Sequence, residues 1–204
     1  MSIHDEGYIK FTCRFTERDL PVPVPDILLA YRDQLYSMQL IGMYPDGIGY
    51  GNISMRTGDG IQFLITGTQT GNKYPIQAAH FCLVTEVDID KNTVFGTGNI
   101  QASSETMTHA ACYMANAHVH MVMHIHHAGM WQYYLNKLPT VSDQITYGTP
   151  EMARAVMSLL RQHQTSGCII TAGHVEGLFI YGNTPQDAMQ LCQQLFYYWS
   201  ANNG

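Results

Sequence analysis

The stretch "HVHMVMHIHH", residues 118–127, constrains the fold of this chain more than any other segment. Successive side chains of a β-strand point to opposite faces, so as a strand this stretch has one apolar face and one imidazole face. The apolar face carries Met121, Met123 and Ile125, and the other face carries His120, Val122, His124 and His126. We therefore predict a strand that seals a core on one side and presents ring nitrogens on the other.

His124 and His126 have a spacing that suits a shared metal ion. Two such residues on one face of a strand stand roughly 6.5–7 Å apart, and their ring nitrogens can each approach one ion to ~2.1 Å. His118 and His120 have the same spacing and remain an alternative pair, although they lie nearer the turn that enters the strand. The competing interpretation of each histidine is a hydrogen-bonded core residue.

A catalytic zinc site typically has three protein ligands and one open position, so a third ligand must come from elsewhere in the chain. His174 follows the apolar segment "CIITAG" and precedes the turn "HVEG". Ends of core strands are places where a rigid scaffold presents reactive groups. An ordinary turn histidine is the alternative interpretation. The other candidates are His4, His80, His109 and His163.

Hydrophobic periodicity places helices and short strands along the rest of the chain. We predict helices near residues 27–43, 103–117, 128–135, 149–164 and 185–200, and strands near residues 51–56, 61–66, 81–89, 92–98, 118–127, 168–173 and 178–182. Serines at the start of the second helix suit an N-cap. This order predicts an α/β fold in which helices cover both sides of a central, largely antiparallel, mixed sheet.

Composition narrows the class of protein. The 204 residues, 46% of them hydrophobic, suit one domain over residues 1–204, with residues 1–25 packing on it as an N-terminal extension. A net charge of −6 without clusters of basic residues argues against nucleic acid or an anionic membrane as partner. The N-terminus lacks the pattern of a signal peptide, no segment suits a membrane helix, and the five cysteines are scattered. We expect a cytoplasmic protein with reduced cysteines.

Five segments, in their order along the chain, resemble the class II aldolase/adducin family, which includes L-fuculose-phosphate aldolase. The resemblance extends over about residues 26–200, and no single segment is diagnostic by itself. The segments are "GNISMR" (51–56), "SSE" (103–105), "HIH" (124–126), "YGTPEMA" (147–153) and "GHVEGLFIYG" (173–182).

The resemblance implies a single α/β domain that holds one divalent metal ion, usually zinc. Its ligands would be His124, His126 and His174, and Glu105, after the paired serines, would be the catalytic acid/base. Members of the family are commonly tetramers with sites at subunit interfaces, so a homo-oligomer, most simply a tetramer, is expected. Judged without the resemblance, Glu105 is an acidic residue in the first turn of a helix, where it interacts favourably with the helix dipole.

The resemblance also points to a phosphate site. In phosphate-using relatives, positions that resemble Asn52, Ser103 and Ser104 bind the phosphate, and backbone N–H groups at a helix start favour an anion. The family's phosphate loop corresponds here to "LITGTQTG", residues 64–71, which is longer and lacks a proline, so that Thr68 or Thr70 would serve. Helix capping and turn geometry are the alternative roles of these side chains.

Two further departures concern the substrate. "GHVEG" has two residues between the histidine and the glycine, which places Glu176 near the expected site. The segment before "YGTPEMA" is shorter than in the fuculose enzyme, which has a catalytic tyrosine there. Tyr133, Tyr134 and Tyr147 therefore receive no assigned role, and the trimmed segment suggests a different or smaller substrate.

These observations favour a metal-dependent aldolase-type lyase that cleaves or forms a carbon–carbon bond in a small sugar or sugar phosphate. Three neutral imidazoles leave the ion its full charge, so that as a Lewis acid it stabilises the enediolate of a retro-aldol cleavage, while Glu105 moves the proton. A 4-epimerase or a sugar-phosphate dehydratase on the same scaffold is the nearest alternative. A non-enzymatic, adducin-like interaction domain is another, although adducin-type members lack the metal ligands.

Overall fold

A computed structural model describes residues 7–58, 60–162 and 166–203. Its helices are α1 (Asp26–Ser37), α2 (Thr106–Ala115), α3 (Ala128–Tyr134), α4 (Pro150–Arg161) and α5 (Pro185–Asn203), with a short 3-10 helix η1 (Ala78–His80). Its strands are β1 (Thr12–Glu17), β2 (Gly42–Met43), β3 (Gly49–Tyr50), β4 (Asn52–Arg56), β5 (Phe63–Thr66), β6 (Phe81–Asp88), β7 (Thr93–Gly98), β8 (Met121–His126), β9 (Thr140–Val141), β10 (Gly167–Thr171) and β11 (Gly177–Gly182).

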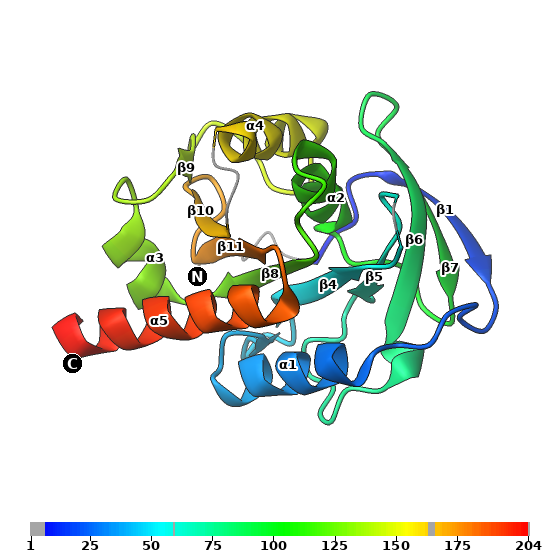
Figure 1. Ribbon diagram of the computed structural model, residues 1–204, viewed down its shortest axis with the longest axis horizontal. Coiled ribbons are helices and arrows are strands. Elements are labelled where there is room, and N and C mark those ends of the chain that lie inside the picture. The colour runs from blue at the N-terminus through cyan, green and yellow to red at the C-terminus, as the bar shows by residue number, and fades with distance from the viewer. Residues whose placement is uncertain (1–6, 59, 163–165, 204) are drawn as a thin grey trace.

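The described residues form a nine-stranded sheet in the order β1-β7-β6-β5-β4-β8-β11-β10-β9, and a separate hairpin of β2 and β3. The pairs β1–β7 and β9–β10 at the two ends are parallel, and the pairs between them are antiparallel. The predicted single α/β domain with a mixed, largely antiparallel sheet is therefore confirmed. Strand β8, which carries the histidines, lies in the middle of the sheet (Figure 1).

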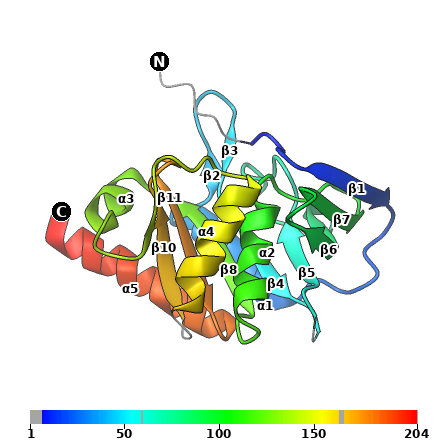
Figure 2. The same cartoon turned by 90° about the horizontal axis from the view of Figure 1, so that it is seen from above.

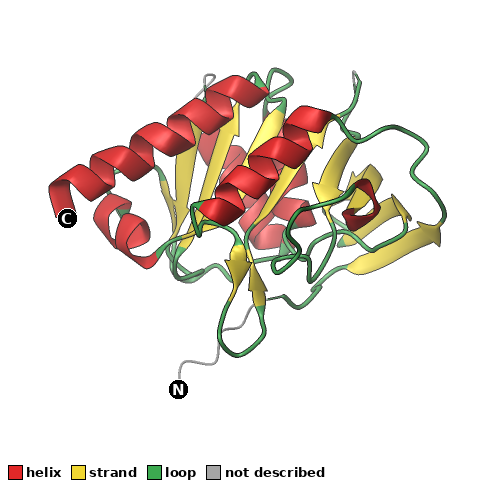
Figure 3. Ribbon diagram, turned by 90° about the horizontal axis from the view of Figure 1, so that it is seen from below, coloured by secondary structure: helices red, strands yellow, loops and turns green. Residues whose placement is uncertain are grey.

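Helices cover both faces of the sheet, as the sequence predicts. Helices α2 and α4 lie on one face (Figure 2), and α1 and α5 lie on the other (Figure 3). Strand β8 contributes to the core on each side: Val122 packs with the α2 and α4 residues, whereas Met121, Met123 and Ile125 pack with those of α1 and α5. The alternation that defined the strand in the sequence thus decides which core each side chain enters.

Two helix boundaries differ from the predictions. Helix α1 ends at Ser37, not near residue 43, because Gln39 adopts a left-handed backbone with φ of 59°. The N–H groups of Leu40 and Gln39 then bond the carbonyls of Leu35 and Tyr36, which is the Schellman arrangement that terminates a helix. Helix α2 begins at Thr106, so the two serines before Glu105 lie in a turn and do not cap the helix.

The N-terminal part of the chain contains a strand that the pattern did not predict. Strand β1 pairs with β7 along its whole length, from Thr12 opposite Thr93 to Glu17 opposite Gly98. Phe11, just before it, is buried in the core on the α2 and α4 side. Among the residues that the structure describes, no helix has the length and apolar character to cross a membrane.

Candidate active site

The three histidines meet at one end of the central strands. His124 and His126 belong to β8, and His174 lies in the turn between β10 and β11. Because β8 and β11 run antiparallel with His126 opposite Gly177, this turn is folded back onto the end of β8. One ligand atom from each of the three histidines lies within 4.8 Å of the others, and all three side chains are buried.

A glycine allows this close approach. A Cβ atom added to Gly177 would lie 2.8 Å from the hydroxyl of Thr171 and 3.0 Å from the Cε1 atom of His124. Contacts that short force neighbouring atoms to move, so a side chain at position 177 would displace the His124 ring. The glycine of the "HVEG" turn therefore has a packing role in bringing the strands and the rings together.

Neighbouring groups decide which nitrogen of His124 and of His126 carries the proton. His124 Nδ1 lies 3.3 Å from the carbonyl oxygen of Leu178, which can only accept, so Nδ1 is the donor. The Tyr44 hydroxyl donates to the Glu176 carboxylate at 2.8 Å, and its oxygen, 3.0 Å from His126 Nδ1, accepts from that nitrogen. Both rings in their neutral form consequently present an unprotonated Nε2 atom.

The two Nε2 atoms lie 3.0 Å apart. Two nitrogen lone pairs at this distance repel each other unless a cation or a proton lies beside them. A divalent ion bound by both nitrogens removes that repulsion, and neutral imidazole is a preferred ligand of zinc. The chemistry of the donor set therefore fits a metal ion, with His174 as the third ligand.

Glu105 lies beside the histidine cluster, in the turn that leads into α2. Its Oε1 atom is 3.4 Å from Nδ1 of His174, and its Oε2 atom accepts a hydrogen bond of 3.0 Å from the Thr108 hydroxyl. Only 2% of the Glu105 surface is exposed. The carboxylate is thus held next to the three imidazoles without contact with bulk water, which suits a group that moves protons on a bound substrate.

The predicted substrate-binding residues line one inner cavity. Asn52, Thr68, Ser103 and Ser104 surround it together with Glu105 and a series of glycines. Asn52 lies opposite His124 in the β4–β8 register, which places its side chain on the same face as the ring. Its Oδ1 atom is buried and makes no hydrogen bond among the described residues. Polar atoms of this kind, directed at a cavity, are suited to a ligand.

Backbone hydrogen bonds fasten the loop after β5 to the turn that carries the serines. The Thr68 N–H bonds the Gln101 carbonyl at 2.9 Å, and Gly67 forms a bridge with Ala102. The hydroxyl of Thr70, the alternative to Thr68, donates to the Gly67 carbonyl at 2.8 Å. The Thr70 hydroxyl therefore stabilises the loop, and both threonines line the inner cavity.

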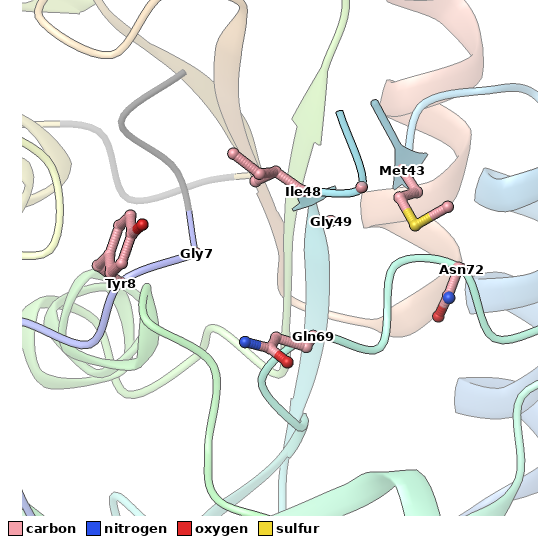
Figure 4. A pocket seen from close by; sticks show the side chains of 8 residues that line it. Gly7, Tyr8, Met43, Ile48, Gly49, Gln69 and Asn72 are labelled. Carbon is pink, nitrogen blue, oxygen red and sulfur yellow. The ribbon is translucent and has the colours of Figure 1, made fainter. Parts of the chain in front are cut away.

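An outer cavity of about 300 Å³ adjoins the inner one, and the two share Gly7, Gly49 and Gln69. Figure 4 shows the side chains of Ile48 and Gln69 extending toward the side on which Tyr8 lies. Gln69 belongs to the loop of residues 64–71, and its backbone is left-handed with a φ of 57°. Gln69 therefore lines both cavities at the place where they adjoin.

The other histidines that the sequence offered as candidates lie away from the cluster wherever the structure describes them. The alternative pair, His118 and His120, is exposed, and His120 Nδ1 lies 3.2 Å from the carbonyl oxygen of His118. His80 accepts a hydrogen bond from the Gln77 N–H at the start of η1. His4 and His163 lie outside the described residues.

His109 lies in the interior of the protein. Its Nδ1 atom is 2.6 Å from the Ser54 hydroxyl, which also contacts the Tyr113 hydroxyl at 2.7 Å. Burial lowers the pKa of the His109 imidazole to about 3, because a charged ring is poorly solvated there. His109 is therefore a neutral, hydrogen-bonded core residue, which is the second interpretation that the sequence offered for a histidine of this chain.

The tyrosines near the shortened segment separate into two groups. The Tyr147 ring stacks on His174, with centroids 4.6 Å apart, and Lys10 Nζ lies 3.5 Å from the centre of the Tyr147 ring. Tyr133 and Tyr134 contact α5 instead: Tyr133 packs against Tyr198, and the Tyr134 hydroxyl donates to the Leu195 carbonyl. Tyr147 is thus the member of this set that touches the histidine cluster.

Sequence reasoning missed Tyr44, which contacts His126 from the turn between β2 and β3. In the sequence, Tyr44 belongs to "YPDG", an ordinary turn signal, and carries no periodicity that points to a site. Glu176 was placed near the site because of its position between His174 and Gly177, and its carboxylate indeed reaches Tyr44. Pattern alone does not show that a turn far away in the chain supplies the hydroxyl between them.

Solved structures with similar folds include three that cover most of this chain. A sugar-phosphate aldolase from Thermotoga maritima matches with a TM-score of 0.64 at 16% identity, over 85% of this chain and 90% of that one. L-fuculose-1-phosphate aldolase from Thermus thermophilus matches with 0.58 at 21% identity, over 87% and 95%. YgbL from Klebsiella pneumoniae, described as a putative aldolase/epimerase/decarboxylase, matches with 0.61 at 16% identity, over 85% of each chain. At these identities the likeness concerns the fold.

Comparison of the sequence with curated proteins gave no match. The family described as "Class II Aldolase and Adducin N-terminal domain" matches residues 45–199. This range is well over half of the chain and contains the histidine cluster, Glu105 and the predicted substrate-binding residues. The protein therefore belongs to the class II aldolase and adducin family.

Proposed function

We propose that this protein is a metal-dependent, aldolase-type lyase that cleaves or forms a carbon–carbon bond in a small sugar or sugar phosphate. The observation that carries the proposal is the approach of the Nε2 atoms of His124 and His126 to 3.0 Å, beside His174 and the buried Glu105. An interaction domain has no need for such a cluster, and burying it is costly unless the groups are paired or bound.

The three histidines would hold one divalent ion, most simply Zn²⁺. When bound, the ion acts as a Lewis acid that draws electron density from the carbonyl group of the substrate. Three neutral imidazoles contribute no negative charge, so the ion keeps its full charge for this purpose. The fourth coordination position of a zinc site of this kind is open to the substrate.

Glu105 would carry the proton in both directions of the reaction. Its Oε1 atom faces His174 and its Oε2 atom is held by the Thr108 hydroxyl, so the carboxylate has a fixed orientation at the cavity. In cleavage, the carboxylate removes the proton from the substrate hydroxyl as the carbon–carbon bond breaks, and the same group later returns a proton to carbon. Burial excludes bulk water, which would otherwise compete for that proton.

The inner cavity would bind the polar end of the substrate. Its side-chain groups are the amide of Asn52 and the hydroxyls of Thr68, Ser103 and Ser104. These neutral donors and acceptors suit sugar hydroxyls or a phosphate, the latter assisted by backbone N–H groups of the loops. We further propose that the enzyme is a homotetramer in the cytoplasm, because members of the family are commonly tetramers.

Metal removal and product analysis test this proposal together. Treatment with a chelator should abolish turnover of a panel of ketose phosphates and aldol substrates, and Zn²⁺, Mn²⁺ or Co²⁺ should restore it. An aldolase yields two carbon fragments, whereas an epimerase or a dehydratase yields one product of unchanged carbon number. A protein that is fully active after complete metal removal would overturn the proposal.

The binding-module alternative has its own outcome in the same preparation. An adducin-like interaction domain would be favoured if the protein, purified in metal-containing buffer, holds less than about half an equivalent of metal per chain and binds no more when Zn²⁺ is added. Substitution of His174 by Ala is the matched variant, because it removes the third ligand and leaves the β8 pair intact. The lyase proposal expects this variant to lose both metal and turnover.

A further inference from the structure

Two side chains outside the proposed ligand set lie behind His126: Tyr44 contacts its ring, and Glu176 contacts Tyr44. The Tyr44 oxygen lies 3.0 Å from His126 Nδ1, and its hydroxyl donates to Glu176 Oε2 at 2.8 Å. The three groups form a chain that runs from a carboxylate through a phenol to an imidazole. Because the carboxylate can only accept, each proton in this chain has one possible direction.

Backbone hydrogen bonds fix the positions of the loops that carry Tyr44 and Glu176 relative to His126. The His126 N–H bonds the Leu40 carbonyl at 3.0 Å, which ties β8 to the segment that leads into the Tyr44 turn. The His127 N–H bonds the Glu176 carbonyl, also at 3.0 Å. Tyr44 and Glu176 therefore approach His126 from two different loops, each fastened to the end of β8.

The backbone of Glu176 is in an unfavourable conformation. Its φ is 70°, in the left-handed region. Glycine adopts this region readily, whereas a residue with a side chain such as glutamate does so at a cost in free energy. Such outliers persist where the surroundings require the side chain, and they occur preferentially at functional sites. A glycine at position 176 would suit the turn better, so the presence of glutamate there points to the use of its carboxylate.

The neighbouring cavity shows that this side of His126 is distinct from the substrate side. Tyr44, Tyr50, His126 and Glu176 line a third cavity together with residues that follow α1, residues at the start of α3 and Phe196 of α5. Glu105 and the serines line the inner cavity instead. The Tyr44–Glu176 pair thus lies on the side of the His126 ring that faces away from the substrate-binding residues.

We propose that Tyr44 and Glu176 are positioning residues that hold His126 as its Nδ1–H tautomer, with the Nε2 lone pair directed at the metal position. This inference rests on the proposed metal-dependent function. Without the Tyr44 oxygen, the other tautomer becomes favourable, because Nε2–H can then donate to His124 Nε2 at 3.0 Å. That bond would occupy both ligand nitrogens and compete directly with the metal.

Zinc affinity is the first test. Competition with a chromophoric chelator on the full chain should give a dissociation constant about 10–100-fold higher for Tyr44→Phe and for Glu176→Gln than for the wild type, as is typical for partners of metal-ligating histidines. Tyr50→Phe is the matched control. Its hydroxyl donates to the Gln39 carbonyl and not to His126, so its zinc affinity should equal that of the wild type.

The ring ¹⁵N chemical shifts of His126 in the metal-free protein are the second test, because they report the tautomer directly. The wild type should show a protonated Nδ1 and an unprotonated Nε2, and Tyr44→Phe should shift the population toward Nε2–H. Glu176→Gly covers the case in which Glu176→Gln fails to fold, since glycine suits a φ of 70° and still removes the carboxylate.

The two measurements separate the inference from the proposed function. The inference would be overturned if the wild type binds zinc and if Tyr44→Phe and both Glu176 variants bind it with the same affinity and keep the same His126 tautomer. The lyase proposal would stand in that case. A wild type with no zinc affinity would overturn the proposed function together with the affinity argument. In that event the tautomer shifts still decide whether Tyr44 controls His126.

Discussion

Glu105 and Glu151 show how differently one side-chain type behaves at the scale of the residue. Both residues lie near the start of a helix: Glu105 directly precedes α2, and Glu151 is the acidic residue in the first turn of α4. Its side chain is 66% exposed, whereas Glu105 is 2% exposed and faces His174. The first-turn interpretation therefore describes Glu151 well, and Glu105 has surroundings that it does not explain.

We predict that Glu105→Gln lowers kcat by about 10²- to 10⁴-fold while zinc remains bound, because the amide keeps the size of the side chain but carries no proton to and from carbon. Steady-state kinetics and metal content of the same preparation measure the two effects. Glu151→Gln is the control, with kcat within about twofold of the wild type. A Glu105→Gln variant that retains full turnover would remove this residue from the mechanism.

At the residue scale, the sequence predicts side chains whose pattern is local and misses those whose partner is distant. The alternation in residues 118–127 placed His124 and His126 on one face, because a strand fixes which side chains share a face, and their distance from the turn favoured them over His118 and His120. Tyr44 has no such local signal. Its contact with His126 exists because the β2–β3 turn folds against the end of β8, a distance of 82 positions along the chain.

At the scale of the element, the end of α1 shows a conflict between local conformation and residue type. Gln39 occupies the left-handed position of the Schellman arrangement, where glycine is the usual residue. We predict that Gln39→Gly raises the free energy of unfolding by about 1 kcal/mol, because glycine adopts this conformation without steric cost. Urea unfolding of the metal-free protein measures the change.

The same substitution five residues earlier, inside the helix, provides the control. Gln34 lies within α1, where the backbone is helical, and Gln34→Gly should lower the free energy of unfolding by about 1 kcal/mol. Opposite signs for one chemical change in one helix would confirm that the backbone conformation, and not the loss of a glutamine side chain, decides the effect. Destabilisation by both substitutions would contradict the prediction.

Elements with strong periodicity and clear termini were predicted well. Helix α4 has Thr149 as N-cap, with its hydroxyl accepting from the Met152 N–H, and Pro150 in its first turn. Strand β1 was not predicted because its sequence carries little hydrophobic pattern. It pairs on one side only, and its side chains are exposed or half-buried. Edge strands depend on a partner's free backbone groups more than on their own pattern.

At the scale of the whole molecule, the site depends on register that no single segment contains. The third histidine reaches the first two because β11 lies antiparallel beside β8, and Asn52 reaches them because β4 lies on the other side of β8. Local reasoning identified His174 only as one candidate among several, and the family resemblance selected it. The inner cavity likewise combines loops after β5 with the turn before α2, which becomes visible only when the chain is folded.

The folding of the whole molecule is coupled to pH through His109 in the core. Burial lowers the pKa of His109 to about 3, whereas the same side chain in the unfolded chain has its ordinary pKa of 6.5. Below pH 6.5 His109 therefore binds a proton in the unfolded state, whereas in the folded state it stays neutral down to about pH 3. The stability that neutral His109 contributes is fully present above the unfolded pKa and is lost progressively as the pH falls from there toward the folded pKa.

We predict that His109→Gln flattens the dependence of unfolding free energy on pH, by up to about 1.4 kcal/mol per pH unit between about pH 6 and pH 4, since glutamine binds no proton in either state. Glutamine also retains an amide that can meet the Ser54 hydroxyl, which limits the loss of stability at neutral pH. Urea unfolding at several pH values, with a chelator to remove metal, measures the slope. His120→Gln, at an exposed position, should leave the slope of the wild type unchanged. Parallel curves for the wild type and His109→Gln would show that acid destabilises the protein through other groups.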